Sequence, residues 1–309
     1  MEKNSKIFIT GHTGLVGSAI LRKLKEHNYS NLITKEFPIL DLTRQAETEN
    51  FFKKEKPEYL FLAAGKVGGI YANNTYPAEF IYQNIMIESN VIHYAYLSRV
   101  KKLLFFGSSC IYPKYSKQPI KEEYLLSSKL ESTNEPYAIA KIAGIKMCQA
   151  YNRQYNSNFI SIMSTNLYGP GDNYNLETSH VLPALIRKLH EAKINNKPDV
   201  HLWGSGTPRR EFLYVDDLAD ASIFLMNNYN ETEFVNIGTG LDITIKELAY
   251  KIKDIVGYQG DIKWDTTKPD GTPQKLLNVD KLHNLGWTHS YSLTKGITKS
   301  YQWFLQNYG

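Results

Sequence analysis

The sequence predicts an α/β fold built on a doubly wound parallel sheet, with a smaller, mixed but mainly helical lobe toward the C-terminus. Short apolar runs alternate with helical patterns through the first half of the chain, as expected when crossover helices join parallel strands. The second half is less regular, and its clearest pattern is helical. A chain of 309 residues suits one large domain of this kind or two smaller ones.

The individual elements follow from apolar runs and their spacing. Five runs in the first half have the length of buried strands: 6–10, 31–34, 59–64, 103–106 and 159–163. Residues 234–238 look like a further strand of the same sheet. Apolar residues recur every four positions from Val16 to Leu24, which is typical of a helix packed on a sheet. Thr244 and Glu247 have capping-box spacing and predict the start of a helix in the second half.

A glycine-rich loop follows the first predicted strand and opens the first predicted helix. The segment GHTGLVG places Gly11, Gly14 and Gly17 at G-x-x-G-x-x-G spacing. Glycines permit a tight turn and a close approach to a pyrophosphate, whose charge the helix N-terminus attracts. We therefore expect a Rossmann-type dinucleotide domain. It should comprise residues 1–165, with a return of the chain at about 212–240, while 166–309 form most of a substrate lobe.

The adenine end of a dinucleotide is expected near the end of the second strand. Lys35 and Glu36 stand side by side there, and a basic residue favours a 2′-phosphate whereas an acidic one favours a ribose hydroxyl. These two residues leave NADP and NAD both open. Asp41 and Leu42 could reach the adenine end, although an aspartate at a helix start is an equally good interpretation.

The segment NEPYAIAKIAG, residues 134–144, predicts a helix with a reactive tyrosine. Its proline suits the first turn, and Asn134 or Thr133 can cap the helix. Tyr137 and Lys141 are four residues apart and should share one face. A neighbouring ammonium lowers the pKa of a tyrosine hydroxyl, but an amphipathic helix often carries such a pair by chance.

Ser108 follows the fourth predicted strand, where open α/β sheets bind ligands, and is well placed to hydrogen-bond a substrate oxygen. Its neighbour Ser109 is an alternative, and local turn bonding would explain either residue. Together with the glycine loop, Ser108, Tyr137 and Lys141 form the ordered set of a short-chain-dehydrogenase type site. Tyr137 would then pass a proton to a carbonyl oxygen as hydride arrives.

A thiol and an imidazole border the same predicted site. Cys110 lies two residues beyond Ser108, and His180 precedes a predicted helix. The two could remove a proton beside a ketone and return one on the opposite face, which is epimerisation. Equally, Cys110 could be a small buried hydrophobe and His180 a helix cap. Cys148 has no such neighbours and is expected in the core.

These motifs make the chain resemble the GDP-L-fucose synthase family, the GDP-4-keto-6-deoxymannose 3,5-epimerase-4-reductases of the extended short-chain dehydrogenases. The likeness covers essentially the whole chain and includes GHTGLVGSAI, GSSCIYPK, NEPYAIAKIAGIK, TNLYGPGDN and WGSGTPRREFLYVDD. It implies that Ser108, Tyr137 and Lys141 are the reductive triad. It also implies that Cys110 and His180 are the epimerisation base and acid.

The resemblance further implies a GDP-4-ketosugar substrate, NADPH as cofactor and a homodimer formed by helices near 80–100 and 136–152. Thr13 and Phe37 stand where arginine would meet a 2′-phosphate, which weakens the NADP preference and leaves NAD open. The implied cofactor contacts are Gly11, Thr13, Gly14, Leu15, Val16, Gly17, Lys35, Asp41, Leu42, Ala63, Ala64, Lys141 and His180. The implied substrate contacts are Ser108, Ser109, Cys110, Asn166, Val181, Leu185, Lys188, Trp203 and Arg210, although Val181 and Leu185 could simply pack the lobe.

Other functions remain to be weighed against this one. A sugar-nucleotide dehydratase would carry Asp-Glu where Ser109 and Cys110 stand. A simple 4-epimerase would retain its dinucleotide between turnovers, and a C4 reductase of a GDP-4-keto-heptose would keep the same triad. A dinucleotide-binding scaffold without activity would usually lack part of the triad, which is complete here.

Composition excludes several classes of protein. The formal net charge of +5 comes from dispersed Lys and Arg, so no nucleic-acid partner is expected. Two cysteines are too few for a disulfide framework or a zinc site, and no metal is expected. No apolar run could span a bilayer and no signal-peptide pattern occurs, so we expect a cytoplasmic protein without a membrane partner.

Overall fold

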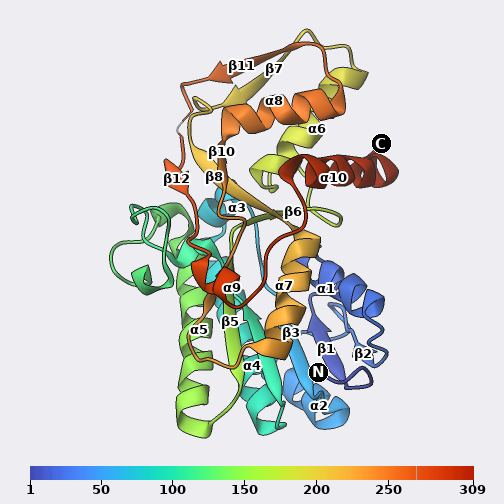
Figure 1. The fold of residues 1–309 in the computed structure, drawn as a ribbon, viewed down its shortest axis with the longest axis vertical. Helices are drawn as coiled ribbons and strands as arrows, with labels where there is room; N and C mark the ends of the chain where they lie inside the picture. Colours follow the sequence, from blue (N-terminus) through green and yellow to red (C-terminus); the bar gives the residue numbers. More distant parts are fainter. Residues whose placement is uncertain (269) are drawn as a thin grey trace.

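The predicted α/β fold is confirmed in a computed structural model that describes residues 1–268 and 270–309. The main sheet has six parallel strands in the order β2-β1-β3-β4-β5-β9 (Figure 1). These strands are β1 (Ile7–Thr10), β2 (Leu32–Ile33), β3 (Tyr59–Leu62), β4 (Lys102–Phe106), β5 (Phe159–Ser164) and β9 (Val235–Ile237). The order places β1 in the interior of the sheet, as in doubly wound folds.

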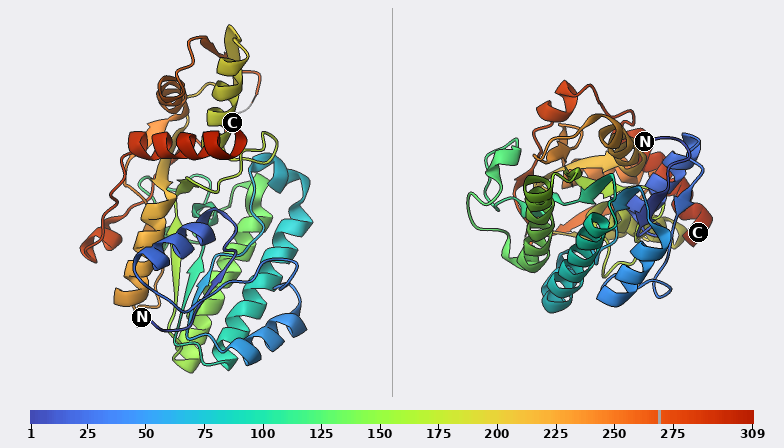
Figure 2. Two further views of the ribbon diagram at one scale, coloured as in Figure 1. Left: turned by 90° about the vertical axis from the view of Figure 1, so that its right-hand side faces the viewer. Right: turned by 90° about the horizontal axis from the view of Figure 1, so that it is seen from below.

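Helices cover both faces of this sheet. One face packs against α1 (Leu15–Glu26) and α7 (Val215–Asn228), and the other packs against α2 (Gln45–Glu55), α4 (Pro77–Leu97) and α5 (Glu135–Tyr155). Seen from below, α5, α4 and α2 form a row along one face (Figure 2). Because side chains alternate along a strand, Ile7 and Ile9 join one core and Phe8 joins the other.

The second lobe lies above the carboxyl ends of these strands (Figure 1). A four-stranded sheet contains β6 (Asn166–Tyr168), β8 (Arg209–Tyr214), β10 (Asp242–Thr244) and β12 (Gln274–Lys275), and β7 (Asp199–Trp203) pairs with β11 (Asp261–Asp265). The lobe also contains α6 (Val181–Ile194), α8 (Ile245–Val256) and α10 (Leu293–Tyr308). The predicted capping box of Thr244 and Glu247 begins α8.

Two short helices complete the chain. The helix α3 (Ile70–Thr75) precedes α4, and α9 (Asp280–Asn284) packs against β9 of the main sheet. The chain therefore returns to the main sheet twice after entering the upper lobe, in α7 with β9 and again in α9. Of the helices that the structure describes, none combines the length and the apolar character needed to cross a bilayer.

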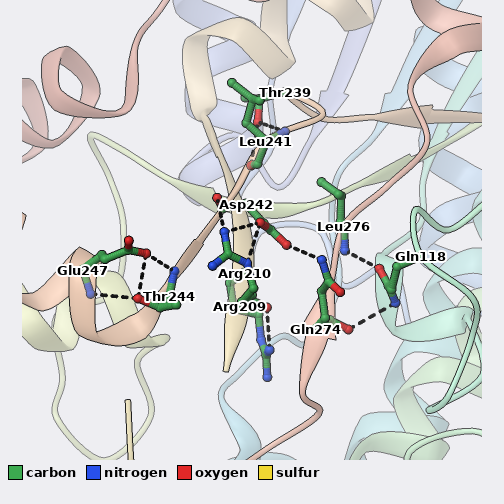
Figure 3. Close-up of polar contacts among 10 residues, drawn as sticks. All are labelled: Gln118, Arg209, Arg210, Thr239, Leu241, Asp242, Thr244, Glu247, Gln274 and Leu276. Atoms are coloured by element: carbon green, nitrogen blue, oxygen red, sulfur yellow. Dashed lines mark hydrogen bonds and ion pairs between the residues drawn. The ribbon is translucent and has the colours of Figure 1, made fainter. Parts of the chain in front are cut away.

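Buried Glu211 ties the two lobes together. Its Oε1 accepts the backbone N–H groups of Thr239 and Gly240 at 2.6 and 2.7 Å, and its Oε2 accepts that of Leu277 at 2.9 Å. Gln118, from the loop after β4, bonds the backbone on both sides of Lys275 (Figure 3). The strand β12 is therefore fixed at the junction of the lobes.

Candidate active site

The glycine loop has the close backbone approach that the sequence predicts. Gly11 has a φ of +64°, and a Cβ there would lie 2.9 Å from the Cα of Ala64. A Cβ at Gly17 would lie 2.2 Å from the carbonyl oxygen of Gly11. Either position would force the β1–α1 turn open if it carried a side chain, so the turn depends on both glycines.

The same turn leaves the start of α1 open to an anion. Gly14 is the N-cap and provides no side-chain acceptor, and the first turn contains no acidic residue. Thr13 and Gly14 are exposed, whereas Leu15 and Val16 are partly buried. Thr10 accepts the N–H of Ala64 at 2.8 Å, which holds Ala63 and Ala64 beside the loop. Free N–H groups at a helix N-terminus suit a pyrophosphate.

Ser108 and Tyr137 meet at the carboxyl end of the main sheet. Ser108 precedes the 3₁₀ turn Ser109–Ile111, where its Oγ accepts the N–H of Cys110 at 3.3 Å, and Ser109 is buried. Tyr137 lies in the first turn of α5, where its ring packs edge-on against Phe80. The serine hydroxyl can therefore meet a substrate oxygen beside the tyrosine hydroxyl.

Lys141 lies on the same face of α5 as Tyr137, as the spacing predicts. Its Nζ is 5.9 Å from the centre of the Tyr137 ring and 4.9 Å from that of Phe105. The same Nζ is 3.0 Å from Oε1 of Glu88 on α4. No motif in the sequence predicts this carboxylate partner.

The pKa of Tyr137 is shifted in the direction opposite to the prediction. Burial raises it, the nearby Cys110 and Glu88 raise it further, and the Ser108 hydroxyl opposes the rise. The expected net lowering by Lys141 is absent, because burial of the hydroxyl is the largest influence on its pKa. Tyr137 therefore keeps its proton at neutral pH and is poised to donate it.

Cys110 has two polar neighbours from distant parts of the chain. Its Sγ accepts a hydrogen bond from Nδ2 of Asn134 at 3.2 Å, and Nζ of Lys275 lies 3.7 Å away. Asn134 is the N-cap of α5, but its side chain bonds this thiol and does not cap the helix as expected. Thr133 does not cap the helix either.

His180 immediately precedes α6, and its side chain makes no capping bond there. The side chain is exposed. Although the residue is open to solvent, the protein atoms around it desolvate the imidazole and lower its pKa, and the charge of Lys275 lowers it further. Lys275 therefore contacts the thiol of Cys110, and its charge also acts on the imidazole of His180.

With this geometry in view, the chain can be compared with known proteins. The NAD dependent epimerase/dehydratase family matches residues 7–238. The chain belongs to this family. It is 60% identical to a putative GDP-L-fucose synthase 2 of Arabidopsis thaliana, with 99% of this chain and 94% of the relative covered. It is 55% identical to the GDP-L-fucose synthase of Escherichia coli, with 98% and 97% covered.

A solved structure shares the architecture as well. The GDP-mannoheptose C4 reductase of Campylobacter jejuni, with NADP bound, matches at a TM-score of 0.92 and 43% identity over 99% of both chains. The expected resemblance to the GDP-L-fucose synthases is thus confirmed. The similar proteins thus include both GDP-L-fucose synthases and a GDP-mannoheptose C4 reductase.

The cofactor residues expected near the second strand are of two kinds. Some are exposed to solvent, and others make hydrogen bonds within the protein. Lys35 is exposed, as are Glu36 and Phe37, the last at 75%. Asp41 accepts the backbone N–H and hydroxyl of Thr43 at 2.9 and 2.7 Å in a turn before α2, whose N-cap is Arg44, so Asp41 does not cap that helix. The carbonyl of Leu42 accepts a bond from Asn90 at 2.9 Å. Of this group, Lys35 has the side chain best able to meet an anion.

The expected substrate residues lie in the upper lobe, and some have clear structural roles. Trp203 ends β7 and is 68% exposed, with the ammonium groups of Lys188 and Lys268 each 5.8 Å from its ring centre. Leu185 is a core residue at 4% exposure, whereas Val181 is 37% exposed at the start of α6. An exposed aromatic face flanked by cations suits a nucleotide base with its phosphates.

Arg210 and Lys275 are neighbours across the pair of strands β8 and β12. Arg210 donates to the carbonyl of Arg209 at 2.8 Å, and burial lowers its pKa. Asn166, on the adjacent strand β6, donates to the carbonyl of Glu211 at 2.8 Å. Sequence reasoning missed Glu88 and Lys275.

Proposed function

We propose that the protein reduces the C4 ketone of a GDP-4-keto-6-deoxyhexose with NADPH after epimerising C3 and C5, the reaction of a GDP-L-fucose synthase. The observation that carries this proposal is the pairing of two acid-base centres. Ser108, Tyr137 and Lys141 supply a reductive centre, and Cys110 with Lys275 and His180 supplies a second. Reduction alone needs only the first centre. Identities of 55–60% to GDP-L-fucose synthases support the same choice.

The residues at the glycine loop fit a dinucleotide. Gly11 and Gly17 leave no room for side chains, and the first N–H groups of α1 face no acidic residue. Lys35 is exposed, so its ammonium can reach a 2′-phosphate. A similar heptose reductase has NADP bound, which supports the same cofactor here. When bound, NADPH supplies the hydride for C4.

In the reductive step, Tyr137 gives the proton of its hydroxyl to the C4 oxygen, which becomes an alcohol. The raised pKa of Tyr137 keeps that proton in place until the oxygen gains negative charge. Ser108 donates a second hydrogen bond to the same oxygen. Lys141 stabilises the negative charge left on Tyr137.

In the epimerisation step, the thiolate of Cys110 takes a proton from the carbon beside the ketone, and the electrons move into an enolate. The ammonium of Lys275, 3.7 Å from the sulfur, stabilises negative charge on the thiolate before the transfer. Asn134 fixes the direction of the sulfur through its 3.2 Å bond. His180 returns a proton from the other face, which inverts the carbon. The C4 oxygen bonded by Ser108 carries the enolate charge.

The GDP moiety belongs in the upper lobe by this account. The face of Trp203 takes the guanine, and Lys188, Lys268 and Arg210 meet the diphosphate. Because Leu185 is part of the core, it shapes this region only through packing.

The helices α4 and α5, which pack against each other, form the dimer contact. Exposed Tyr82, Leu97 and Tyr155 on these helices support that arrangement.

A second candidate is a C4 reductase of a GDP-4-keto-heptose, which the architecture of the Campylobacter jejuni enzyme favours. Steady-state rates of NADPH oxidation distinguish the two. We expect kcat/KM for GDP-4-keto-6-deoxymannose to exceed that for a GDP-4-keto-heptose by at least about tenfold. A preference for the heptose would assign the second function. Absence of turnover with both sugars would refute the proposed reduction.

A further inference from the structure

Behind the reductive triad lies a carboxylate that the proposed chemistry does not require. Glu88 is on α4, and its Oε1 is 3.0 Å from Nζ of Lys141 on α5. Both residues are almost fully buried, with 2% and 4% of their surface exposed. Within the described part of the chain, neither carboxylate oxygen receives a hydrogen bond, so the ion pair is the polar contact that Glu88 makes there. A buried charge needs such a partner.

Glycines lie beside both residues of this ion pair, and Gly144 leaves the room that Glu88 needs. A Cβ at Gly144, in the interior of α5, would lie 2.8 Å from Oε2 of Glu88 and 2.4 Å from the Phe105 ring. A Cβ at Gly65 would lie 3.7 Å from Nζ of Lys141 and would strike Asn84 at 2.7 Å. Glycine lowers the stability of a helix interior. The close approach of α4 and α5 explains why glycine nevertheless stands at position 144.

We propose that Glu88 is a positioning residue that holds Lys141 beside Tyr137 and favours the protonated form of Tyr137, the form that can give a proton to a ketone. The inference rests on the proposed reductase function. The negative charge of Glu88 disfavours the phenolate form of Tyr137. Tyr137 therefore loses its proton at a higher pH when the carboxylate is present.

The other groups around Glu88 do not replace Lys141 as its counter-charge. Cys148 on α5 is buried, and burial raises the pKa of its thiol to about 12, so it is uncharged at neutral pH. Asn84, one turn earlier on α4, donates to two backbone carbonyls and accepts one backbone N–H. Tyr137 on α5 is neutral for the reason given above. Burial raises the pKa of Glu88 itself, and Lys141 opposes the rise.

The pH dependence of ketone reduction tests the proposal. In Glu88→Gln, the basic limb of kcat/KM should move to lower pH by about one unit or more, because the carboxylate no longer favours the proton of Tyr137. The matched control is Glu49→Gln on α2, which removes a half-buried carboxylate paired with Lys53, and the basic limb of this variant should stay at the wild-type position. An unmoved limb in Glu88→Gln would overturn the proposal. Such a result would mean that the carboxyl of Glu88 is neutral or that its charge does not act on Tyr137.

Glu88→Asp provides a second variant if the glutamine variant does not fold. It keeps the charge but shortens the side chain. We expect its basic limb at the wild-type position and a lower kcat, since Lys141 is less well placed. If the basic limb of Glu88→Asp moved to lower pH, as is expected for Glu88→Gln, the result would contradict the role of the charge.

A double-mutant cycle in thermal unfolding tests the ion pair without any substrate. Glu88→Gln and Lys141→Met each leave one buried group without its partner, whereas the double variant leaves neither. The loss in Tm of the double variant should therefore be smaller than the two single losses together. Additive losses would overturn the pairing. A wild-type protein without turnover would refute the proposed reductase but would leave this cycle informative.

Discussion

The ammonium of Lys275 lies 3.7 Å from the sulfur of Cys110, although the two residues come from different lobes. Cys110 follows a strand of the main sheet, and Lys275 is in β12, which Gln118 and Glu211 hold at the lobe junction. A cation so near a thiol stabilises the thiolate, which is the reactive form of cysteine. The contact links the packing of the lobes to the proposed epimerisation.

Replacement of Lys275 should therefore impair epimerisation more than reduction. In Lys275→Met, we expect exchange of the sugar C–H protons with solvent to slow about tenfold or more, because the thiolate loses its nearby cation. Exchange is measured by NMR in heavy water. Lys246→Met, at an exposed position on α8, is the control and should exchange at the wild-type rate. Unchanged exchange in Lys275→Met would remove Lys275 from the mechanism.

Tyr137→Phe should separate the two activities. Loss of the hydroxyl removes the proton donor, so NADPH oxidation should fall by about 100-fold or more. The ring can still pack against Phe80, so the Tm should stay close to that of the wild type. Solvent exchange at the sugar carbons should persist, since it depends on Cys110. Reduction at the wild-type rate would refute the role of Tyr137.

Gly144→Ala should destabilise the protein although alanine is the better helix former. The added Cβ would lie 2.4 Å from the Phe105 ring, and overpacking of this kind costs about 1–3 kcal/mol. Denaturant unfolding measures the loss. Lys146→Ala on the same helix is the control, and its exposed side chain should matter by less than about 0.5 kcal/mol. A stabilised Gly144→Ala protein would show that α4 and α5 do not approach this closely.

Asp172→Asn should stabilise the protein in a pH-dependent way. Burial raises the pKa of Asp172 to about 7 from an ordinary 3.8, and its Oδ2 has no hydrogen-bond partner within the described residues. The folded carboxyl therefore binds its proton more tightly than the unfolded one, so wild-type stability falls as pH rises between these values.

The variant lacks this titration, so its advantage over the wild type should grow between pH 4 and pH 7, to at most about 4 kcal/mol. Thermal unfolding at several pH values measures the difference. Asp254→Asn, at an exposed position on α8, should show no such trend. A constant difference between Asp172→Asn and the wild type would contradict the raised pKa.

The sequence predicts the main sheet well because each strand there is a compact apolar run between helical patterns. All six predicted runs overlap strands of the main sheet, from β1 to β9. The strands of the upper lobe are harder to find. The strand β12 has only two residues, Gln274 and Lys275, and depends on hydrogen bonds from distant segments. Such long-range pairing leaves no local apolar pattern.

The candidate site was predictable where chemistry depends on spacing, and not where it depends on packing. Four residues separate Tyr137 from Lys141, and a helix brings them to one face. Glu88 is a different case, because a glutamate in a helix is usually exposed and nothing local marks this one as buried. Asn134 likewise looked like a cap, but tertiary structure turned its side chain to Cys110.

The most direct test of the account is to place deuterium in the product. The protein would be mixed with GDP-4-keto-6-deoxymannose and NADPH in heavy water, and the product examined by mass spectrometry and NMR. We predict solvent deuterium at both C3 and C5 of a sugar reduced at C4, because Cys110 and His180 exchange those protons before Tyr137 acts. A reduced sugar without deuterium on carbon would contradict the combined reaction and indicate a simple C4 reductase.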